Sequence, residues 1–246
     1  MLMLDSNLSL ERCTELGSWD NLVADSPQGS IFCQSLFLNA LEVEYDLWLV
    51  LRAGQPELGA VLFRRGDEVL PAPYPFTMYQ GMFFTQAVAT LPYHNRFRKI
   101  PAILDFVLGE LSTHYNRLSF CMHYNMEDIR GIQWFHYHEP DQGRFRIDLN
   151  YTGLIDLQAP NNFDAYVATI RKKNRQHYRR AMRDDLSVEV SDDVDTLDHL
   201  HNLTFKRQGL GRQDRNANLL RSITATALSG GFGELLVCSD GDGEAL

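Results

Sequence analysis

The order of its predicted elements constrains the fold of this chain most, because one order occurs near both ends. Two helices, a strand, a glycine-bearing turn and a second strand are predicted over Leu16–Arg64, and the same order begins again at Asp193. The recurrence indicates two similar domains, and coincidence is the competing explanation, since such units are common. We therefore predict an α+β protein with an N-terminal domain over residues 1–150 and a C-terminal domain over residues 151–246.

Hydrophobic periodicity and turn residues predict the individual elements. Asn162 is a predicted N-cap, after which Phe163, Tyr166 and Ile170 keep helical spacing. The predicted helices are Leu16–Ala24, Gln34–Val43, Arg98–Leu111 with Pro101 in its first turn, one long helix that starts at Phe163 and carries the basic residues after it, Asp193–Gln208 and Asn216–Ser229. The predicted strands are Leu47–Arg52, Leu58–Arg64, Glu68–Pro71, Leu118–Met122, Gln133–His138, Arg144–Leu149, Thr152–Leu157, Leu186–Val190 and Glu234–Ser239.

The C-terminal domain is predicted to be truncated. The chain stops at Leu246, where the strand after the second glycine-bearing turn would begin. Either the chain is a fragment, or the strand Glu234–Ser239 presents a bare edge that needs a cover. We expect such an edge to pair with another chain and to produce a homo-oligomer.

Composition limits the class of protein. No apolar run reaches the roughly 18 residues that a membrane-spanning helix needs, and the first residues do not resemble a signal peptide, so we predict a cytoplasmic protein. The formal net charge of −9 argues against a general nucleic-acid binder. Four widely spaced cysteines predict reduced thiols in the core. His136 and His138 would face the same way on a strand, but no third ligand can be placed, so no metal site is predicted.

The loop Pro71–Gly81 is the second notable segment. It contains three prolines and three aromatic residues, which exclude a regular helix and indicate a stiff, aromatic-lined loop. Tyr74, Tyr79 and Gln80 are candidate ligand-binding residues, because tyrosine hydroxyls seek hydrogen-bond partners and such loops often line pockets. The alternative is a proline-stiffened plug in the core.

The basic segment Arg171–Arg183 is the strongest functional signal. It holds seven of the 23 Lys and Arg residues of an acidic chain, and it lies between two predicted strands. On a helix, Lys172, Arg175, Arg179 and Arg183 form one stripe, which Arg171 and Arg180 flank. Arginine binds phosphate oxygens bidentately, so several of them together suit a diphosphate. The alternative is a solvated helix face.

Several of these segments together resemble the FemAB-like branch of the GNAT acyltransferase superfamily. The resemblance rests on GSIFCQSLFLNAL, PYPFTMYQGMFF, TGLIDL, the basic helix that ends RRAMRDDLSVEV, and TFKRQGL, and it extends over almost the whole chain. It implies two GNAT-like domains, of which the second is truncated, and a transferase activity. The donor would be acetyl-CoA or another acyl-CoA, and the product an amide on a cell-envelope sugar or a peptidoglycan-type precursor.

The resemblance also implies a phosphate-bearing small molecule or a glycolipid as the acceptor, with the basic helix near its diphosphate. Together with the stripe, this gives Lys172, Arg175, Arg179 and Arg180 as the candidate binding residues. Arg179 or Arg180 best matches the family's diphosphate-binding arginine. Some aminoacyl-transferring members carry a lysine soon after the Gln34-Ser35 pair, and its absence here argues against that donor. The loop that would hold the pyrophosphate of coenzyme A falls beyond the last strand. The alternative function is a non-catalytic module that binds an anionic glycan or a nucleotide-sugar.

Overall fold

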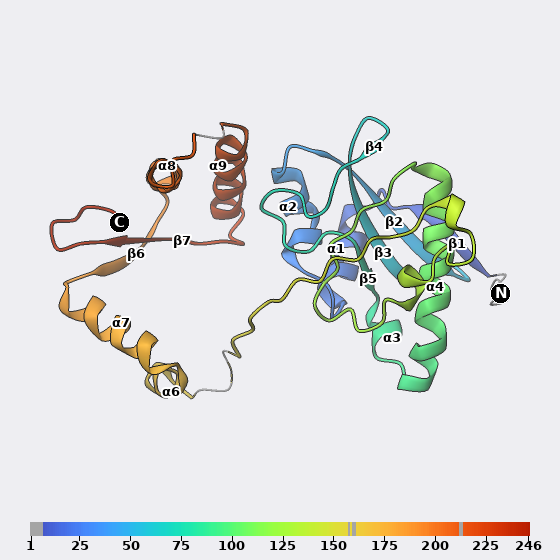
Figure 1. Ribbon diagram of the computed structural model, residues 1–246, viewed down its shortest axis with the longest axis horizontal. Helices are drawn as coiled ribbons and strands as arrows, with labels where there is room; N and C mark the ends of the chain where they lie inside the picture. Colours follow the sequence, from blue (N-terminus) through green and yellow to red (C-terminus); the bar gives the residue numbers. More distant parts are fainter. Residues whose placement is uncertain (1–6, 157, 159–160, 212–213) are drawn as a thin grey trace. The chain divides into compact units, whose positions relative to one another are not determined.

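The computed structural model describes residues 7–156, 158, 161–211 and 214–246, and it is a mixed α/β structure with a curled antiparallel sheet (Figure 1). The chain divides into two compact units, Met1–Leu149 and Asn150–Leu246, and each is described by itself.

The first unit contains an antiparallel sheet with helices on both faces (Figure 1). The strand order is β1-β2-β3-β4. β5 also pairs with β3, at a different part of that strand from β4. Its strands are β1 (Leu8–Arg12), β2 (Glu44–Arg52), β3 (Gln55–Arg65), β4 (Glu68–Val69) and β5 (Met82–Phe84). Its helices are α1 (Leu16–Asp25), α2 (Ser35–Ala40), α3 (Gln86–Ala89), α4 (Tyr93–His114) and α5 (Arg130–Gln133), with 3₁₀ turns at Ile31–Cys33 and Pro140–Gln142.

The core of this unit lies where α4 packs on one face of the sheet. Leu58, Ala60 and Leu62 alternate along β3 toward this face, and none of them is exposed. α4 presents a continuous apolar stripe that includes Leu104 and Leu108. Each buried aliphatic side chain contributes about 1.5–3 kcal/mol, so this contact contributes much of the stability of the unit.

The opposite face of the sheet is equally well covered. Trp19 of α1 is fully buried and meets Phe83 of β5 edge to face, at 5.2 Å between ring centroids. Phe83 lies against Gly59, where an added Cβ would come within 2.4 Å of the ring. β3 is therefore buried on both faces, which explains its nearly continuous apolar sequence.

The helix α4 starts earlier than the sequence predicts, at Tyr93, so Pro101 lies inside it and not in its first turn. Proline has no backbone N–H, so the carbonyl four residues earlier, that of Phe97, loses its helical donor. The Arg130 guanidinium replaces this donor: its Nη2 donates to the Phe97 oxygen at 2.9 Å. A side chain from α5 thus satisfies the group that the proline leaves unpaired.

Other helices and strands of the first unit follow the sequence patterns more closely. The structure confirms α1, α2 and the strands β2, β3 and β4, with shifts of a few residues at their ends.

All four cysteines of the chain are free thiols, although only Cys33 is buried and the other three are half-buried.

Three predicted strands of the first unit are wrong. Residues 118–122 form a half-buried loop whose strand-like pairing among the described residues is limited to one bridge, Gln80↔Cys121. In place of Gln133–His138 the chain forms α5 and turns, because Ile132 and Phe135 are buried at helical spacing while Trp134 is exposed. Arg144–Leu149 is extended but pairs with no described strand, and most of its residues are exposed.

The second unit contains α6 (Phe163–Thr169), α7 (Lys172–Arg183), β6 (Ser187–Ser191), α8 (Val194–Arg207), α9 (Asp214–Ser229) and β7 (Leu235–Ser239). β6 pairs antiparallel with β7, and α8 and α9 lie on one side of this ribbon (Figure 1). The Asp193 side chain caps α8 by accepting hydrogen bonds from the N–H groups of Asp195 and Thr196. The predicted strand Thr152–Leu157 is wrong over residues 152–156, which are exposed and pair with no described strand; Leu157 lies outside the described residues.

A common order of elements occurs in both units. In the first, β1 precedes α1 and α2 and pairs antiparallel with β2, the strand that follows them. In the second, β6 precedes α8 and α9 and pairs antiparallel with β7. A turn follows each second strand, and after the turn the chain pairs back, through β3 in the first unit and through the bridge Ser239↔Ala245 in the second.

Candidate anion-binding site

The predicted long helix is divided into α6 and α7. α6 is capped by Asn162, whose Oδ1 accepts a hydrogen bond from the backbone N–H of Ala165 at 2.8 Å. Its C-cap Ile170 has an extended backbone, with ψ at 158°, and Arg171 is also non-helical, with ψ at 143°. The basic residues therefore occupy a helix of their own, which starts at Lys172.

Arg175 holds the two helices together. Its Nη1 donates to the carbonyl oxygens of Ala168 and Ile170, at 2.8 and 2.6 Å. These carbonyls belong to the end of α6, where the helix supplies no further N–H donors. One turn later the Tyr178 ring packs on Phe163, at 5.5 Å between centroids. Arg175 thus has a structural role that the sequence pattern does not reveal.

Positive charge on α7 has little compensation from carboxylates. Among the described residues, Asp184 alone lies within ion-pair distance of any of the seven Lys and Arg residues, through Arg180 at 3.2 Å. Arg171 provides no side-chain cap, and Lys172 and Lys173 occupy the first turn, where the helix dipole favours negative charge. The start of α7 therefore combines uncapped N–H groups with unpaired cations, which is an arrangement that attracts anions.

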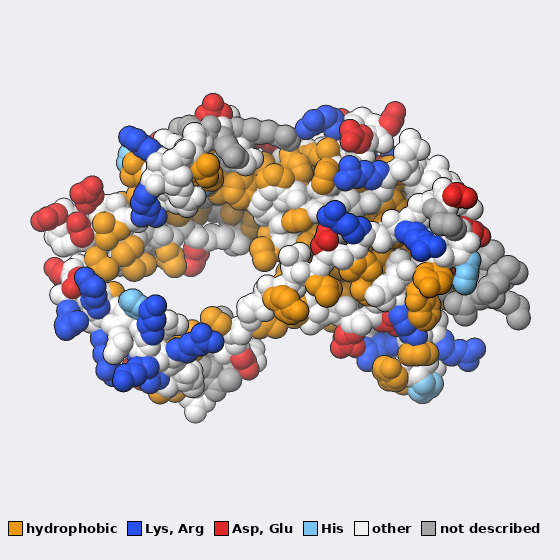
Figure 2. All heavy atoms as spheres, viewed as in Figure 1, with side chains coloured by type: hydrophobic (Ala, Val, Ile, Leu, Met, Phe, Trp, Pro, Cys, Tyr) orange, Lys and Arg blue, Asp and Glu red, His pale blue; other side chains and the backbone are white. Residues whose placement is uncertain are grey.

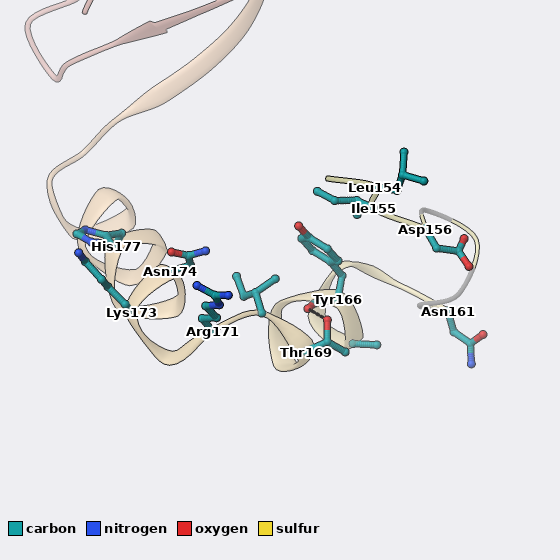
Figure 3. A pocket seen from close by; sticks show the side chains of 12 residues that line it. Leu154, Ile155, Asp156, Asn161, Tyr166, Thr169, Arg171, Lys173, Asn174 and His177 are labelled. Carbon is teal, nitrogen blue, oxygen red and sulfur yellow. Dashed lines mark hydrogen bonds between the residues drawn. The ribbon is translucent and has the colours of Figure 1, made fainter. Parts of the chain in front are cut away.

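A pocket of about 1080 Å³ opens at this end of α7 (Figure 3). Arg171, Asn174 and Tyr166 reach toward one space, and Leu154 and Ile155 lie across from them (Figure 3). The lining residues are Leu154, Ile155, Asp156, Asn161, Ala165, Tyr166, Thr169, Ile170, Arg171, Lys173, Asn174 and His177. The wall from α7 and its N-cap thus offers Arg171, Lys173 and His177 as groups that can bind an anion.

The pocket uses a different face of α7 from the one that the sequence analysis selects. Of the predicted binding residues, Lys172, Arg175, Arg179 and Arg180 are not among the lining residues. At 100° per residue, Lys172 and Arg179 lie on the far side of the helix from Asn174 and His177. Tyr178 is the residue in the sequence that could have indicated the pocket face of α7. Its aromatic ring packs on α6, so its neighbours on the helix line the groove between α6 and α7.

The aromatic loop belongs to the first unit, where Tyr74 and Gln80 are core residues. Gln80 is fully buried, and its Oε1 accepts a hydrogen bond from the Tyr74 backbone N–H at 2.8 Å. Tyr79 is half-buried, and its ring lies 4.5 Å from that of His123, whose pKa is lowered by burial. For Tyr74 and Gln80 the contacts fit the core plug.

Two further kinds of site can be assessed. Nowhere in the described part of the chain do three or more His, Cys, Asp or Glu residues cluster as metal ligands would. Across the same residues, none of the helices combines the length and the apolar character needed to cross a bilayer.

Comparison with known proteins adds no relative to this description. No protein-family model matches the chain, and no curated protein and no solved structure matches it either. The function is therefore argued from the geometry.

Proposed function

We propose that the chain is an N-acyltransferase of the GNAT superfamily, similar to its FemAB-like branch, and that the pocket beside α7 binds the phosphate groups of its acceptor. One observation carries the proposal: Arg171, Lys173 and His177 line a single pocket, and among the described residues neither Arg171 nor Lys173 has a carboxylate partner. Two exposed cations without a carboxylate partner are stabilised most by a ligand with several negative oxygens.

The repeated order of elements supports the proposed fold of two GNAT-like domains. Each unit starts the shared order with a strand, places two helices after it and returns antiparallel to the first strand. Two copies of one fold would explain this better than two unrelated ribbons, because the pairing of the strands is shared as well as their order.

The chemistry of the proposed reaction is simple. The acceptor amine attacks the thioester carbonyl of acetyl-CoA or another acyl-CoA, a C–N bond forms and the C–S bond breaks. The proton that the nitrogen loses ends on the sulfur, so coenzyme A leaves as its thiol. Binding the acceptor by its phosphate groups would fix the amine relative to the thioester, and such positioning lowers the barrier of a two-substrate reaction. The acceptor class is a phosphate-linked sugar or peptidoglycan-type precursor, either free or as a glycolipid.

A matched pair of variants tests the phosphate site. Arg171→Ala with Lys173→Ala removes two charges that line the pocket, and Lys172→Ala with Arg179→Ala removes two charges from the far side of α7. In a thermal-shift titration with a UDP-linked amino sugar, the first variant should lose the stabilisation that wild type shows, which is about 2.7 kcal/mol at a hundred times Kd. The second should keep it.

Activity is assayed separately, by the release of coenzyme A thiol from acetyl-CoA in the presence of the same amino sugar. Thiol release that requires the acceptor supports the transferase. Binding without thiol release supports the alternative function, a non-catalytic module for an anionic glycan or a nucleotide-sugar. Equal thermal shifts in both variants and wild type would remove the phosphate site itself.

A further inference from the structure

His177 is a titratable member of the pocket beside α7, and it lies one helical turn after Lys173, which lines the same pocket. Residues four apart on a helix have Cβ atoms about 5–6 Å from each other, so one phosphate group can contact both side chains. In Figure 3 the side chains of Lys173 and His177 lie on the same side of α7. The imidazole is therefore placed to add a contact to a phosphate that Lys173 binds.

The His177 ring is available to take up a proton. Its side chain is exposed, and the ring has no hydrogen bond, ion pair or ring contact within the described residues. Other histidines are held by their surroundings: the Nδ1 of His123 accepts a hydrogen bond from the Asn125 backbone N–H, and the His201 ring lies 4.8 Å from that of Phe205. Histidine is also the side chain that changes its charge near neutral pH.

Positive charge surrounds the ring on its own helix. Arg171 and Lys173 line the same pocket, and neither has a carboxylate partner among the described residues. Arg180 follows His177 by three positions and is paired with Asp184, at 3.2 Å. Figure 2 shows the Lys and Arg side chains that gather over α7, with a histidine side chain among them.

The facing walls of the pocket add one acid and one phenol. Asp156 alone among the lining residues carries a carboxylate, and Figure 3 places it at the other end of the pocket from His177. Tyr166 of α6 has a hydroxyl of a kind that is neutral near pH 7. A proton on His177 therefore adds a like charge beside Lys173, which is unfavourable until an anion binds to both.

We infer that the pocket takes up a proton on His177 when it binds phosphate groups, so that the imidazolium becomes a ligand of the phosphate beside Arg171 and Lys173. The proton comes from solvent, binds to the unprotonated ring nitrogen and returns to solvent when the ligand leaves. A bound anion favours the charged ring, whereas the neighbouring cations disfavour it in the empty pocket, so ligand and proton strengthen each other's binding. This linkage rests on the proposed phosphate site and makes acceptor binding tighter as pH falls.

A UDP-linked N-acetyl sugar is the suitable probe. Both phosphates of its diphosphate are esterified, so its charge stays constant over the range in which histidine titrates, whereas pyrophosphate itself gains protons there. In calorimetric titrations wild type should bind this probe about tenfold more tightly at about pH 5.5 than at about pH 8, as expected for one charged hydrogen bond that forms only at the lower pH. Titrations near pH 7 in two buffers of different protonation enthalpy should show an uptake of about half a proton per ligand.

His177→Gln separates the proton from the other contacts of the side chain. Glutamine still donates a hydrogen bond but cannot take up a charge, so this variant should match wild type at the higher pH and lose both the gain at the lower pH and the proton uptake. His199→Gln is the matched control, because His199 is an exposed histidine on α8 of the same unit and does not line the pocket. It should keep the affinity and the proton uptake of wild type.

Two results would overturn the proton linkage and leave the phosphate site in place. One is binding by wild type with equal affinity at both pH values and no proton uptake, and the other is uptake that His177→Gln retains. Weak binding of His177→Gln at the higher pH would also overturn it, since the ring would then contribute without its proton. If wild type binds the probe at neither pH, the proposed phosphate site fails and the linkage fails with it.

Discussion

Asp46 is the most informative single position for the stability of the first unit. Asp46 lies on β2 and is 6% exposed, and its carboxylate accepts a hydrogen bond from the Tyr115 hydroxyl. That hydroxyl in turn accepts from Trp48 Nε1 at 3.0 Å. Arg12 and Arg64 lie at 3.2 and 3.1 Å from the same carboxylate oxygen. Burial and the bond to Asp46 raise the pKa of Tyr115, so the hydroxyl stays a donor.

Replacing Asp46 with alanine should destabilise the first unit by about 3 kcal/mol. Loss of a charged hydrogen bond costs about 1.5–3 kcal/mol, and the Tyr115 hydroxyl keeps a buried proton without an acceptor. Arg12 adds little, because its side chain is 56% exposed and water replaces the ion pair. Arg64 is less exposed and adds about 0.5 kcal/mol.

Urea unfolding followed by tryptophan fluorescence measures this loss in the first unit alone, because all three tryptophans lie there. Glu44→Ala is the matched control: Glu44 also pairs with Arg64, but its side chain is 58% exposed, so its loss should stay within about 0.5 kcal/mol. A loss below about 1 kcal/mol for Asp46→Ala, or one no larger than that of Glu44→Ala, would refute the reasoning.

Two further predictions concern the same unit. Burial raises the pKa of Cys33 to about 12, so the stability that the neutral thiol contributes is complete below the ordinary thiol pKa and falls as pH rises from about 9 toward 12. Cys33→Ala should therefore flatten the alkaline limb of a stability–pH curve, and an unchanged limb would contradict this. Gly59→Ala should cost about 1–3 kcal/mol in urea unfolding, because its Cβ would meet the Phe83 ring at 2.4 Å. Gly54→Ala, where no atom lies within 4 Å but φ is +77°, tests backbone strain without the clash, and an equal loss there would show that packing is not the cause.

Local patterns predicted the elements that carry a strong apolar period or a clear cap. β3 and α4 are examples, since β3 is a short continuous apolar run next to a turn and the buried residues of α4 repeat at helical spacing. Asp193 and Asn162 act as caps as their types suggest. Elements were missed where burial depends on distant residues: Gln133–His138 alternates like a strand, yet Phe135 alone of its apolar residues reaches the core.

In the candidate site, too, the sequence predicts what local residues determine and misses what depends on contacts in the folded chain. The concentration of charge in Arg171–Arg183 is evident from the sequence, but the face that lines the pocket is not. That face depends on the break at Ile170, which Arg175 holds by bonds to carbonyls that any helix end would offer. Backbone acceptors leave no trace in the sequence, so Arg175 was assigned to ligand binding and not to this role.

Calorimetric titration with pyrophosphate tests the central claim most directly, that the pocket face of α7 binds phosphate groups. Arg171→Ala with Lys173→Ala and Lys172→Ala with Arg179→Ala remove the same charge from the same segment, so long-range attraction falls equally in both. The account predicts that the pocket variant binds about tenfold or more weakly than wild type, and that the far-side variant stays within about threefold. Equal weakening in the two variants would contradict it, because the ligand would then respond to net charge and not to the pocket.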